Sequence, residues 1–248
     1  MRKNRNNFGF SLTEVLLALG TLSIGMIFVA GVFPVAIYFS TQATEQTIAA
    51  VVADEAFAKI RLCGESDPGY QNWLAQPPVA GCVDFNDVVA INPDEFAYPS
   101  DFTVDVLQRR YWWSALCRRL GDTRLVQVTV FVSRKISAST TYPDPAAPIG
   151  GQVSYPMPVK VGVVELVGGD VLRIDDTMKT FINDGYTIAR DQTGQLYRVL
   201  ERRPSEDDTI VLDRDWIGAA TDAVWVVPPP DGGGRYPCIA VYQKVIRF

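Results

Sequence analysis

The sequence predicts an α+β protein in which a long N-terminal helix packs on an antiparallel β-sheet head, with an additional small C-terminal β-barrel or sandwich module. Three observations support this prediction. An uncharged, largely apolar run extends from Val15 to Phe39, an amphipathic helical pattern follows it, and short β-branched segments separated by turn residues occupy much of the remaining chain. With 248 residues, the chain is long enough for one large domain or two small ones.

The apolar run is long enough to cross a membrane as a helix. Its 25 residues would span about 37 Å at ~1.5 Å per residue, which exceeds a hydrocarbon core of ~30 Å. The first nine residues hold three basic residues and no acid, namely Arg2, Lys3 and Arg5, which favours a cytoplasmic N-terminus and a head on the far side. A cleaved secretory signal fits less well because its apolar part is shorter. A plain signal anchor explains most of this pattern.

Glu14 is not explained by a plain anchor. A carboxylate at the mouth of a transmembrane helix costs free energy unless it is neutralised, so it indicates a function. No lysine or arginine lies within one helical turn of it. Cleavage of the chain between Gly9 and Phe10 would create an α-amino group four residues before Glu14. That amine could pair with the carboxylate in the same helix or in a neighbouring one.

The segment Gly9–Leu19, which reads GFSLTEVLLAL behind a short basic leader, resembles the class III signal of type IV prepilins and type II secretion pseudopilins. The resemblance implies that a prepilin peptidase cuts after Gly9 and that the new N-terminal Phe10 is N-methylated. It implies that Glu14 neutralises the N-terminus of an adjacent subunit in a helical filament. It also implies a single-pass protein of the inner (cytoplasmic) membrane whose head is periplasmic. The implied partners are other pilins or pseudopilins, the prepilin peptidase, the inner-membrane assembly platform and the lipid bilayer.

The stem departs from the family pattern at one position. Many family stems carry a helix-bending proline about 21 residues after the phenylalanine. Here Gly31 stands at that position, and Pro34 follows three residues later. We expect Pro34 to kink the helix or to melt it locally, because it removes one backbone hydrogen bond.

Beyond the apolar run the helical pattern continues and becomes amphipathic. Apolar residues recur at helical spacing along one face, namely Ile48, Ala49, Val52, Ala53, Ala56, Phe57 and Ile60. One helix from about Phe10 to Leu62 is therefore predicted, with its second half as the spine of the head. Other residues must pack on this apolar stripe and shield it from water, because a long helix is only marginally stable alone. The natural candidates for this cover are two predicted strands, Tyr111–Cys117 and Leu125–Val132, which are joined by a turn at Gly121-Asp122.

The chain divides into five predicted segments. Residues 1–9 form the cleaved leader, 10–39 the transmembrane and filament-core helix, and 40–141 the pilin-like head. Residues 142–158, with five prolines and a Gly-Gly pair, are predicted to be a linker. The remaining segment, 159–248, is the C-terminal β module. Its short strands are expected at 159–167, 171–174, 186–190, 196–200, 209–212, 223–227 and 239–246.

The four cysteines, Cys63, Cys82, Cys117 and Cys238, are widely spaced and form no CxxC pair. This spacing does not suit a zinc site. In an extracytoplasmic head disulfides become feasible, and four cysteines allow three pairings. Cys63–Cys82 is the preferred pair because it closes the shortest loop, and buried free thiols are the alternative.

The composition excludes several kinds of catalysis. The chain contains no histidine, so it has no Ser-His or Cys-His nucleophile, no imidazole acid–base group and no histidine-ligated metal. Phosphate-cradling loops and local serine-nucleophile signatures are also absent from the sequence. We therefore predict a protein that is not an enzyme and that holds no cofactor or metal.

Several acidic clusters could suggest calcium, but none has the spacing of an EF-hand loop. They are Asp84 with Asn86 and Asp87, Asp175-Asp176, Glu206-Asp207-Asp208, and Asp213 with Asp215. We interpret them as solvated turn residues, and a calcium-binding loop is the alternative.

Basic and aromatic residues are interleaved in Arg109–Trp113, and Arg118-Arg119 follow. Such a run could stack on and hold single-stranded DNA. The net charge of the chain is −5, and it becomes −8 without the three cations of the leader, which argues against binding to polyanions. We therefore interpret the run as a strand whose rings fill the core while its arginines cover the exposed ends. No nucleic-acid partner is expected.

These features together predict a minor pilin-like subunit, foremost a pseudopilin of a type II secretion system or a related protein-transport filament. A minor pilin of a DNA-uptake or adhesion pilus is one alternative. A membrane-anchored enzyme or ligand-binding protein that uses the C-terminal β module is the alternative of another class.

Overall fold

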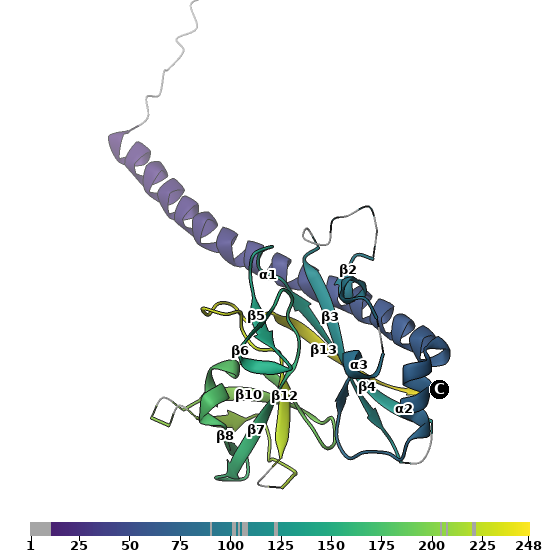
Figure 1. The fold of residues 1–248 in the computed structure, drawn as a ribbon. Helices are drawn as coiled ribbons and strands as arrows, with labels where there is room; N and C mark the ends of the chain where they lie inside the picture. Colours follow the sequence, from purple (N-terminus) through teal and green to yellow (C-terminus); the bar gives the residue numbers. More distant parts are fainter. Residues whose placement is uncertain are drawn as a thin grey trace, which may run out of the picture. The chain divides into compact units, whose positions relative to one another are not determined.

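A single helix, α1 (Leu12–Ser66), carries both the apolar stem and the amphipathic segment (Figure 1). This computed structural model describes residues 11–89, 91–100, 103, 105, 109–121, 124–203, 205–206, 208–219 and 222–248. The chain divides into two compact units, residues 1–47 and residues 48–248. The predicted long helix is confirmed over its described part, and it continues past Leu62 to Ser66.

The end of α1 is set by the next two residues. Asp67 caps a second helix, α2 (Pro68–Ala75), and its carboxylate accepts a 3.1 Å hydrogen bond from the Tyr70 backbone N–H. Pro68 cannot continue α1, because it has no N–H to donate, but it fits the first turn of α2. Two short helices follow, α3 (Phe85–Val88) and a 3₁₀ helix, η1 (Pro93–Phe96).

Residues 48–66 of α1 pack on an antiparallel sheet within the second unit. The predicted stripe is buried at Ala49, Val52, Ala53, Ala56, Phe57 and Ile60. It contacts side chains of β3 (Tyr111–Arg119) and β4 (Leu125–Arg134), among them Trp113, Cys117, Val128 and Val130. The helical periodicity therefore correctly predicted the buried face of this part of the helix.

The sheet has five strands, in the order β1-β3-β4-β13, with β2 also paired to β3. The two short strands are β1 (Val83–Asp84) and β2 (Ala97–Tyr98). Strands β3 and β4 form the predicted antiparallel pair. Gly121 lies at their turn with a φ of +65°, a left-handed conformation that glycine adopts without steric cost. Asp122, the other predicted turn residue, lies outside the described residues.

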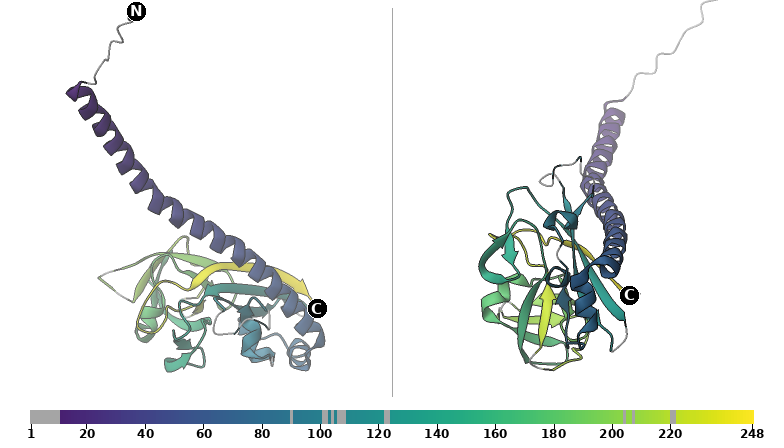
Figure 2. Two further views of the ribbon diagram at one scale, coloured as in Figure 1. Left: turned by 90° about the horizontal axis from the view of Figure 1, so that it is seen from above. Right: turned by 45° about the vertical axis from the view of Figure 1, so that its right-hand side comes forward.

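The last strand, β13 (Cys238–Arg247), belongs to this sheet and not to the C-terminal β module. It pairs with β4 along its length, so the predicted boundary 159–248 is wrong at its C-terminal end. The reason is burial, because Ala240, Tyr242 and Ile246 of β13 extend the apolar cluster that covers α1. Figure 2 shows β13 in yellow beside the second half of α1.

Six strands close into a barrel. The sequence is compatible with either a small barrel or a sandwich in this module, and the structure shows the barrel. Their order around the barrel is β10-β11-β8-β7-β12-β9. The strands are β7 (Val159–Leu166), β8 (Val171–Ile174), β9 (Thr187–Arg190), β10 (Leu196–Arg202), β11 (Thr209–Leu212) and β12 (Ala223–Val226). Inward residues such as Val161, Ile188 and Val199 are fully buried, so the interior is a packed core. A 3₁₀ helix, η3 (Asp176–Phe181), follows β8.

Residues 142–158 do not form the predicted linker. They contain a two-stranded hairpin of β5 (Tyr142–Asp144) and β6 (Ala147–Val153). Prolines are compatible with it, because a two-stranded sheet leaves one edge of each strand unpaired. Tyr142 is fully buried, and Tyr155 stacks on Trp112 with ring centroids 4.7 Å apart. These aromatic contacts fix the segment on the head, which the proline content did not indicate.

The barrel is joined to the sheet by a buried polar network around Asp191. The Asp191 carboxylate accepts a 2.7 Å hydrogen bond from the Trp225 indole and a 3.3 Å bond from the Cys82 backbone N–H. Arg118 and Gln243 of the sheet donate to backbone carbonyls in the turn that follows β9. Sheet and barrel therefore form one body within residues 48–248.

Candidate functional site

The stem of α1 has no protein cover, since every residue from Ser11 to Thr44 is exposed. Leu17 and Phe28, for example, are 72% and 70% exposed. An apolar surface of this extent is unfavourable in water. By its length and composition the helix could cross a membrane. The orientation of the stem and the identity of the membrane stay predictions.

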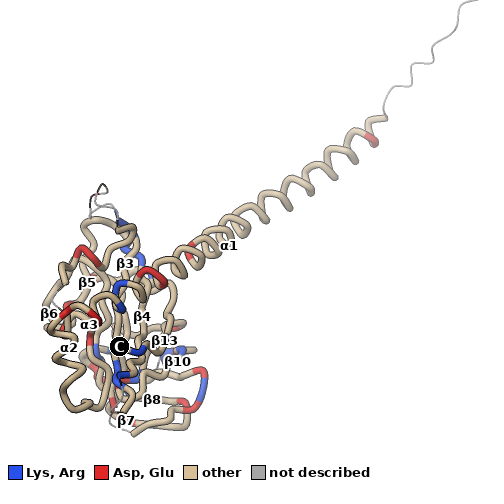
Figure 3. Tube along the Cα trace, turned by 90° about the vertical axis from the view of Figure 1, so that its right-hand side faces the viewer, with Lys and Arg blue, Asp and Glu red and all other residues tan. Residues whose placement is uncertain are grey.

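Glu14 is the single charged residue between Ser11 and Thr44, and Figure 3 shows the long stretch of α1 without charged positions. It lies in the first turn of α1, where its backbone N–H donates to the Ser11 carbonyl at 3.0 Å. This end of the helix carries the positive pole of the helix dipole, which favours a carboxylate. No partner of the Glu14 carboxylate is found among the residues that the structure describes.

The predicted processing residues, Gly9 and Phe10, lie outside the described residues. Cleavage between them, and the pairing of Glu14 with the resulting α-amino group, therefore stay predictions. The described part of the signal, from Ser11 onward, is helical from Leu12.

Several hydroxyl groups of the stem donate to carbonyl groups within the helix. Thr21 donates to the Ala18 carbonyl at 3.0 Å, and Ser23 donates to the Leu19 carbonyl at 2.8 Å. Such bonds hide polar groups from an apolar environment. Apart from Glu14, the stem therefore presents a nearly apolar surface.

Pro34 lies inside α1, and the helix runs through it without a break. The local melting considered above does not occur, because one missing N–H leaves the neighbouring backbone bonds in place. A bend at Pro34 stays a prediction.

All four cysteines carry free thiols in the structure, so the preferred Cys63–Cys82 disulfide is not formed in it. Cys117 lies in the core that faces α1, whereas Cys82 and Cys238 lie in the core between sheet and barrel. Burial raises the pKa of the Cys82 and Cys238 thiols to about 12. These thiols are therefore protonated and weakly nucleophilic at neutral pH.

The two tryptophans of the Arg109–Trp113 run fill the core, as the sequence predicted, whereas Tyr111 is half-buried. Arg109 is buried and does not cover an exposed end. Trp112 and Trp113 are 3% and 2% exposed, which leaves no ring face for base stacking. The sequence did not predict that Arg109 and Arg110 would meet the basic pair Arg134-Lys135. The signal that could have indicated it is the antiparallel pairing of β3 and β4, which places Tyr111 opposite Arg134.

The acidic clusters lie mostly in turns, where carboxylates accept backbone hydrogen bonds. Asp175 accepts from the Thr177 N–H at 2.9 Å, and Asp213 accepts from the Arg198 N–H at 3.0 Å. Within the described part of the chain, no group of three or more Asp, Glu, Cys or His side chains is placed to hold a metal ion. Asp207 lies outside that part.

Asp84 differs from the other acids because it is buried, with 5% exposure. It caps α3 by accepting a 2.9 Å hydrogen bond from the Asn86 N–H. Its second carboxylate oxygen, Oδ2, has no hydrogen-bond partner. Burial raises the Asp84 pKa to about 7.

The predicted site residues are not brought together in one place, since Glu14 lies at the start of the stem and Cys117 lies in the core that faces α1. Cys82 and Cys238 share the core between sheet and barrel. No family model matches the chain, and neither a curated protein nor a solved structure matches it.

Proposed function

We propose that the chain is a minor pilin-like subunit, a pseudopilin, that assembles through its N-terminal helix into a type II secretion or type IV pilus-like filament. The observation that carries this proposal is Glu14, the single charge in a stem that is exposed from Ser11 to Thr44. It stands four residues behind Phe10, in a segment that resembles the signal of prepilins and pseudopilins.

In this proposal, a prepilin peptidase cleaves between Gly9 and Phe10, and Phe10 is N-methylated. The new α-amino cation supplies the counter-charge for Glu14. An unpaired carboxylate in hydrocarbon is costly, so a subunit whose Glu14 pairs with the N-terminus of a neighbour is held at a defined position. The stem first holds the subunit in the bilayer and later forms the filament core with other stems.

The architecture of the head supports the same proposal. Residues 48–66 continue the helix of the stem and are covered by the sheet of β3, β4 and β13. A head built on the continuation of the stem helix suits a subunit that must present a surface outside a helical core. The barrel lies in the chain between β4 and β13, so we regard it as an insertion that elaborates the head.

We place the protein in the inner membrane as a single-pass subunit with a cytoplasmic N-terminus and a periplasmic head. The support is the apolar helix near the N-terminus and the basic leader before it. The burial of Trp112 and Trp113 removes the main feature that favoured a DNA-uptake pilin.

Mass spectrometry of the mature N-terminus tests the proposal. The full-length chain is expressed in two strains, one with an active prepilin peptidase and one with an inactive peptidase. We expect a chain that begins with N-methylated Phe10 in the first strain and an uncleaved chain in the second. An intact Met1 in both strains, or a cut near Ala43, would contradict the proposal.

The alternative of another class gives a different result in the same strains. A membrane-anchored enzyme or binding protein would keep its activity when cleavage after Gly9 is blocked. A pseudopilin would instead fail to enter filaments, which co-purification with the other filament subunits would show.

A further inference from the structure

A cavity of about 740 Å³ at one end of the sheet is lined by cations. Among the described residues that line it there is no acidic side chain; the lining residues include Arg109, Arg110, Arg134, Lys135 and Ser137. The cavity exists because β3 begins where β4 ends. The backbone continues that pairing by one step, since the Lys135 N–H donates to the Arg110 carbonyl at 2.8 Å. Two basic pairs that are distant in sequence thereby become neighbours.

Lys135 is the member of this group that needs an explanation. It is only 5% exposed, and no hydrogen bond or ion pair of its ammonium group is found in the described part of the chain. Burial lowers its pKa, which shows that the charged form is disfavoured where it stands. A buried cation without a counter-charge costs free energy. An anion in the cavity would offset that cost.

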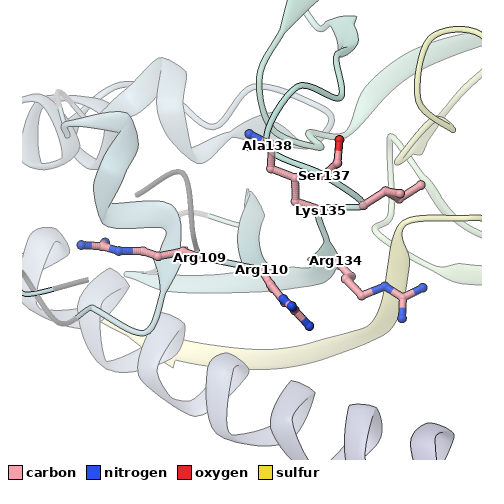
Figure 4. Close-up of a pocket in the computed structure, with 7 residues that line it drawn as sticks. Arg109, Arg110, Arg134, Lys135, Ser137 and Ala138 are labelled. Atoms are coloured by element: carbon pink, nitrogen blue, oxygen red, sulfur yellow. The ribbon is translucent and has the colours of Figure 1, made fainter. Parts of the chain in front are cut away.

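Figure 4 shows how the cations are arranged around the cavity. Arg110 and Arg134 extend toward one side of the strand ends, Lys135 extends toward the opposite side near Ala138, and Arg109 points away from both. The charges thus border a wide space and do not converge on one point. Such a border suits a large anionic group better than a single small ion. The volume lies within the ~300–1,000 Å³ of typical small-molecule sites.

We propose that this cavity binds the phosphate-bearing headgroup of an anionic phospholipid. Guanidinium and ammonium groups are the side chains that bind phosphate oxygens most effectively. The hydroxyl of Ser137 adds a further donor at the lining. The chain as a whole is acidic, with a net charge of −5, so this basic group is a local exception that attracts anions to one place.

The choice of a lipid rests on the membrane anchorage of the proposed function. Nine residues separate Phe39, the end of the apolar run, from Ala49, which is fully buried in the head. A chain of nine residues spans at most about 30 Å when fully extended. The head therefore cannot move far from the headgroup layer of the membrane in which the stem is held.

The cavity lies at the end of the sheet that is remote from the C-terminus of α1. At the opposite end, the Phe248 N–H donates to the Arg124 carbonyl, and the Phe248 ring contacts Gly64 near the C-terminus of α1. From there β4 runs ten residues to Arg134, which is about 30 Å at ~3.3 Å per residue. The cavity is thus far from the C-terminal end of α1.

The experiment uses the full-length chain in neutral detergent micelles. One arm adds phosphatidylglycerol, a second adds phosphatidylcholine, and a third adds inorganic phosphate without lipid. Native mass spectrometry detects bound lipid, and titrations give dissociation constants. Arg110→Gln and Lys135→Met each remove one cation of the cavity. Arg198→Gln removes an exposed arginine of the barrel, so it is a control with the same change of net charge.

We expect the wild-type chain and Arg198→Gln to bind phosphatidylglycerol at least about tenfold more tightly than phosphatidylcholine. Arg110→Gln and Lys135→Met should each lose about tenfold or more of that affinity. Lys135→Arg, which keeps the charge, should retain binding and so separates a lost charge from a damaged fold.

Binding of inorganic phosphate as tight as that of phosphatidylglycerol, with the same dependence on Arg110 and Lys135, would support the phosphate chemistry and overturn the lipid as its source. Equal binding of phosphatidylglycerol by all variants, or binding of no probe, would overturn the site. None of these arms requires cleavage after Gly9. An uncleaved N-terminus would therefore contradict the pseudopilin proposal without deciding this one.

Discussion

The Trp225 indole N–H donates a 2.7 Å hydrogen bond to the Asp191 carboxylate at the junction of barrel and sheet. The same carboxylate forms a 2.8 Å ion pair with Lys160 and accepts from the Cys82 N–H on the sheet side. The Asp191 side chain is 11% exposed. Its removal would leave two buried donors without an acceptor, in surroundings where water cannot replace it.

Replacement of this carboxylate should therefore destabilise the head. We expect Asp191→Ala to lower the free energy of unfolding by about 2–4 kcal/mol. Denaturant titration of the full-length chain in detergent, followed by tryptophan fluorescence, measures the change. The control is Glu165→Ala, which breaks the exposed ion pair with Arg173 and should cost less than about 1 kcal/mol. Equal losses in the two variants would show that the junction is not a stabilising feature.

Gly81 tests the same junction through the backbone. Its φ is +113°, and a Cβ added there would lie 3.0 Å from the Asp191 Oδ2 atom. Gly81→Ala should therefore lower the free energy of unfolding by about 1–3 kcal/mol. Gly162→Ala is the matched control in β7, because a Cβ there would meet nothing within 4 Å. A thermal melt that shifts equally for both variants would contradict the close approach of Gly81 to Asp191.

Asp84 should make the stability of the head depend on pH. Its pKa is raised from 3.8 to about 7 in the folded state, chiefly by burial. The folded state therefore binds more protons than the unfolded chain between these values, and stability falls as pH rises through this window. Between pH 5 and pH 8 the loss should be about 2–3 kcal/mol.

The variant Asp84→Asn isolates this effect. Its amide oxygen can still accept from the Asn86 N–H, but no charge is buried. We expect the variant to be more stable than the wild type at pH 8 and to lose the Asp84 contribution to the pH dependence. Denaturation at pH 5, 6.5 and 8 measures both curves, and parallel curves would refute the raised pKa.

The two halves of α1 were predictable because each carries a local signal. The stem is marked by the absence of charge from Val15 to Phe39, and the second half by apolar residues at helical spacing up to Ile60. The barrel strands were predictable for a similar reason, since turn residues such as Gly185 separate short β-branched runs. Patterns of this kind depend only on neighbours in the sequence.

The features that the sequence analysis missed depend on distant partners. The apolar residues of β13 are compatible with either the barrel or the sheet, and only the open edge of β4 decides between them. The hairpin of β5 and β6 is held by the burial of Tyr142 and by the stacking of Tyr155 on Trp112. The cavity around Lys135 exists only through the register of β3 and β4. None of these partners is specified by local periodicity.

Ile60 tests whether the second half of α1 is the spine of the head. Its side chain is fully buried, whereas Leu62, two residues along the same helix, is 67% exposed. Ile60→Ala should cost about 2–5 kcal/mol of unfolding free energy through lost burial and the cavity that it leaves. Leu62→Ala should change it by less than about 0.5 kcal/mol. Chemical denaturation compares the two, and similar values would contradict the packing of α1 on the sheet.

Glu14→Ala separates processing from assembly. The variant keeps the Gly9-Phe10 pair and the apolar run, so we expect cleavage and N-methylation to proceed as in the wild-type chain. Without the carboxylate, the α-amino cation of a neighbour has no counter-charge in the hydrocarbon core, and the subunit should be depleted from filaments by about tenfold or more. Ser11→Ala is the control, because it changes the residue directly before α1 without changing the charge of the stem. Mass spectrometry reads cleavage and quantitative immunoblotting of sheared filaments reads incorporation. Normal incorporation of cleaved Glu14→Ala would show that Glu14 does not act in docking.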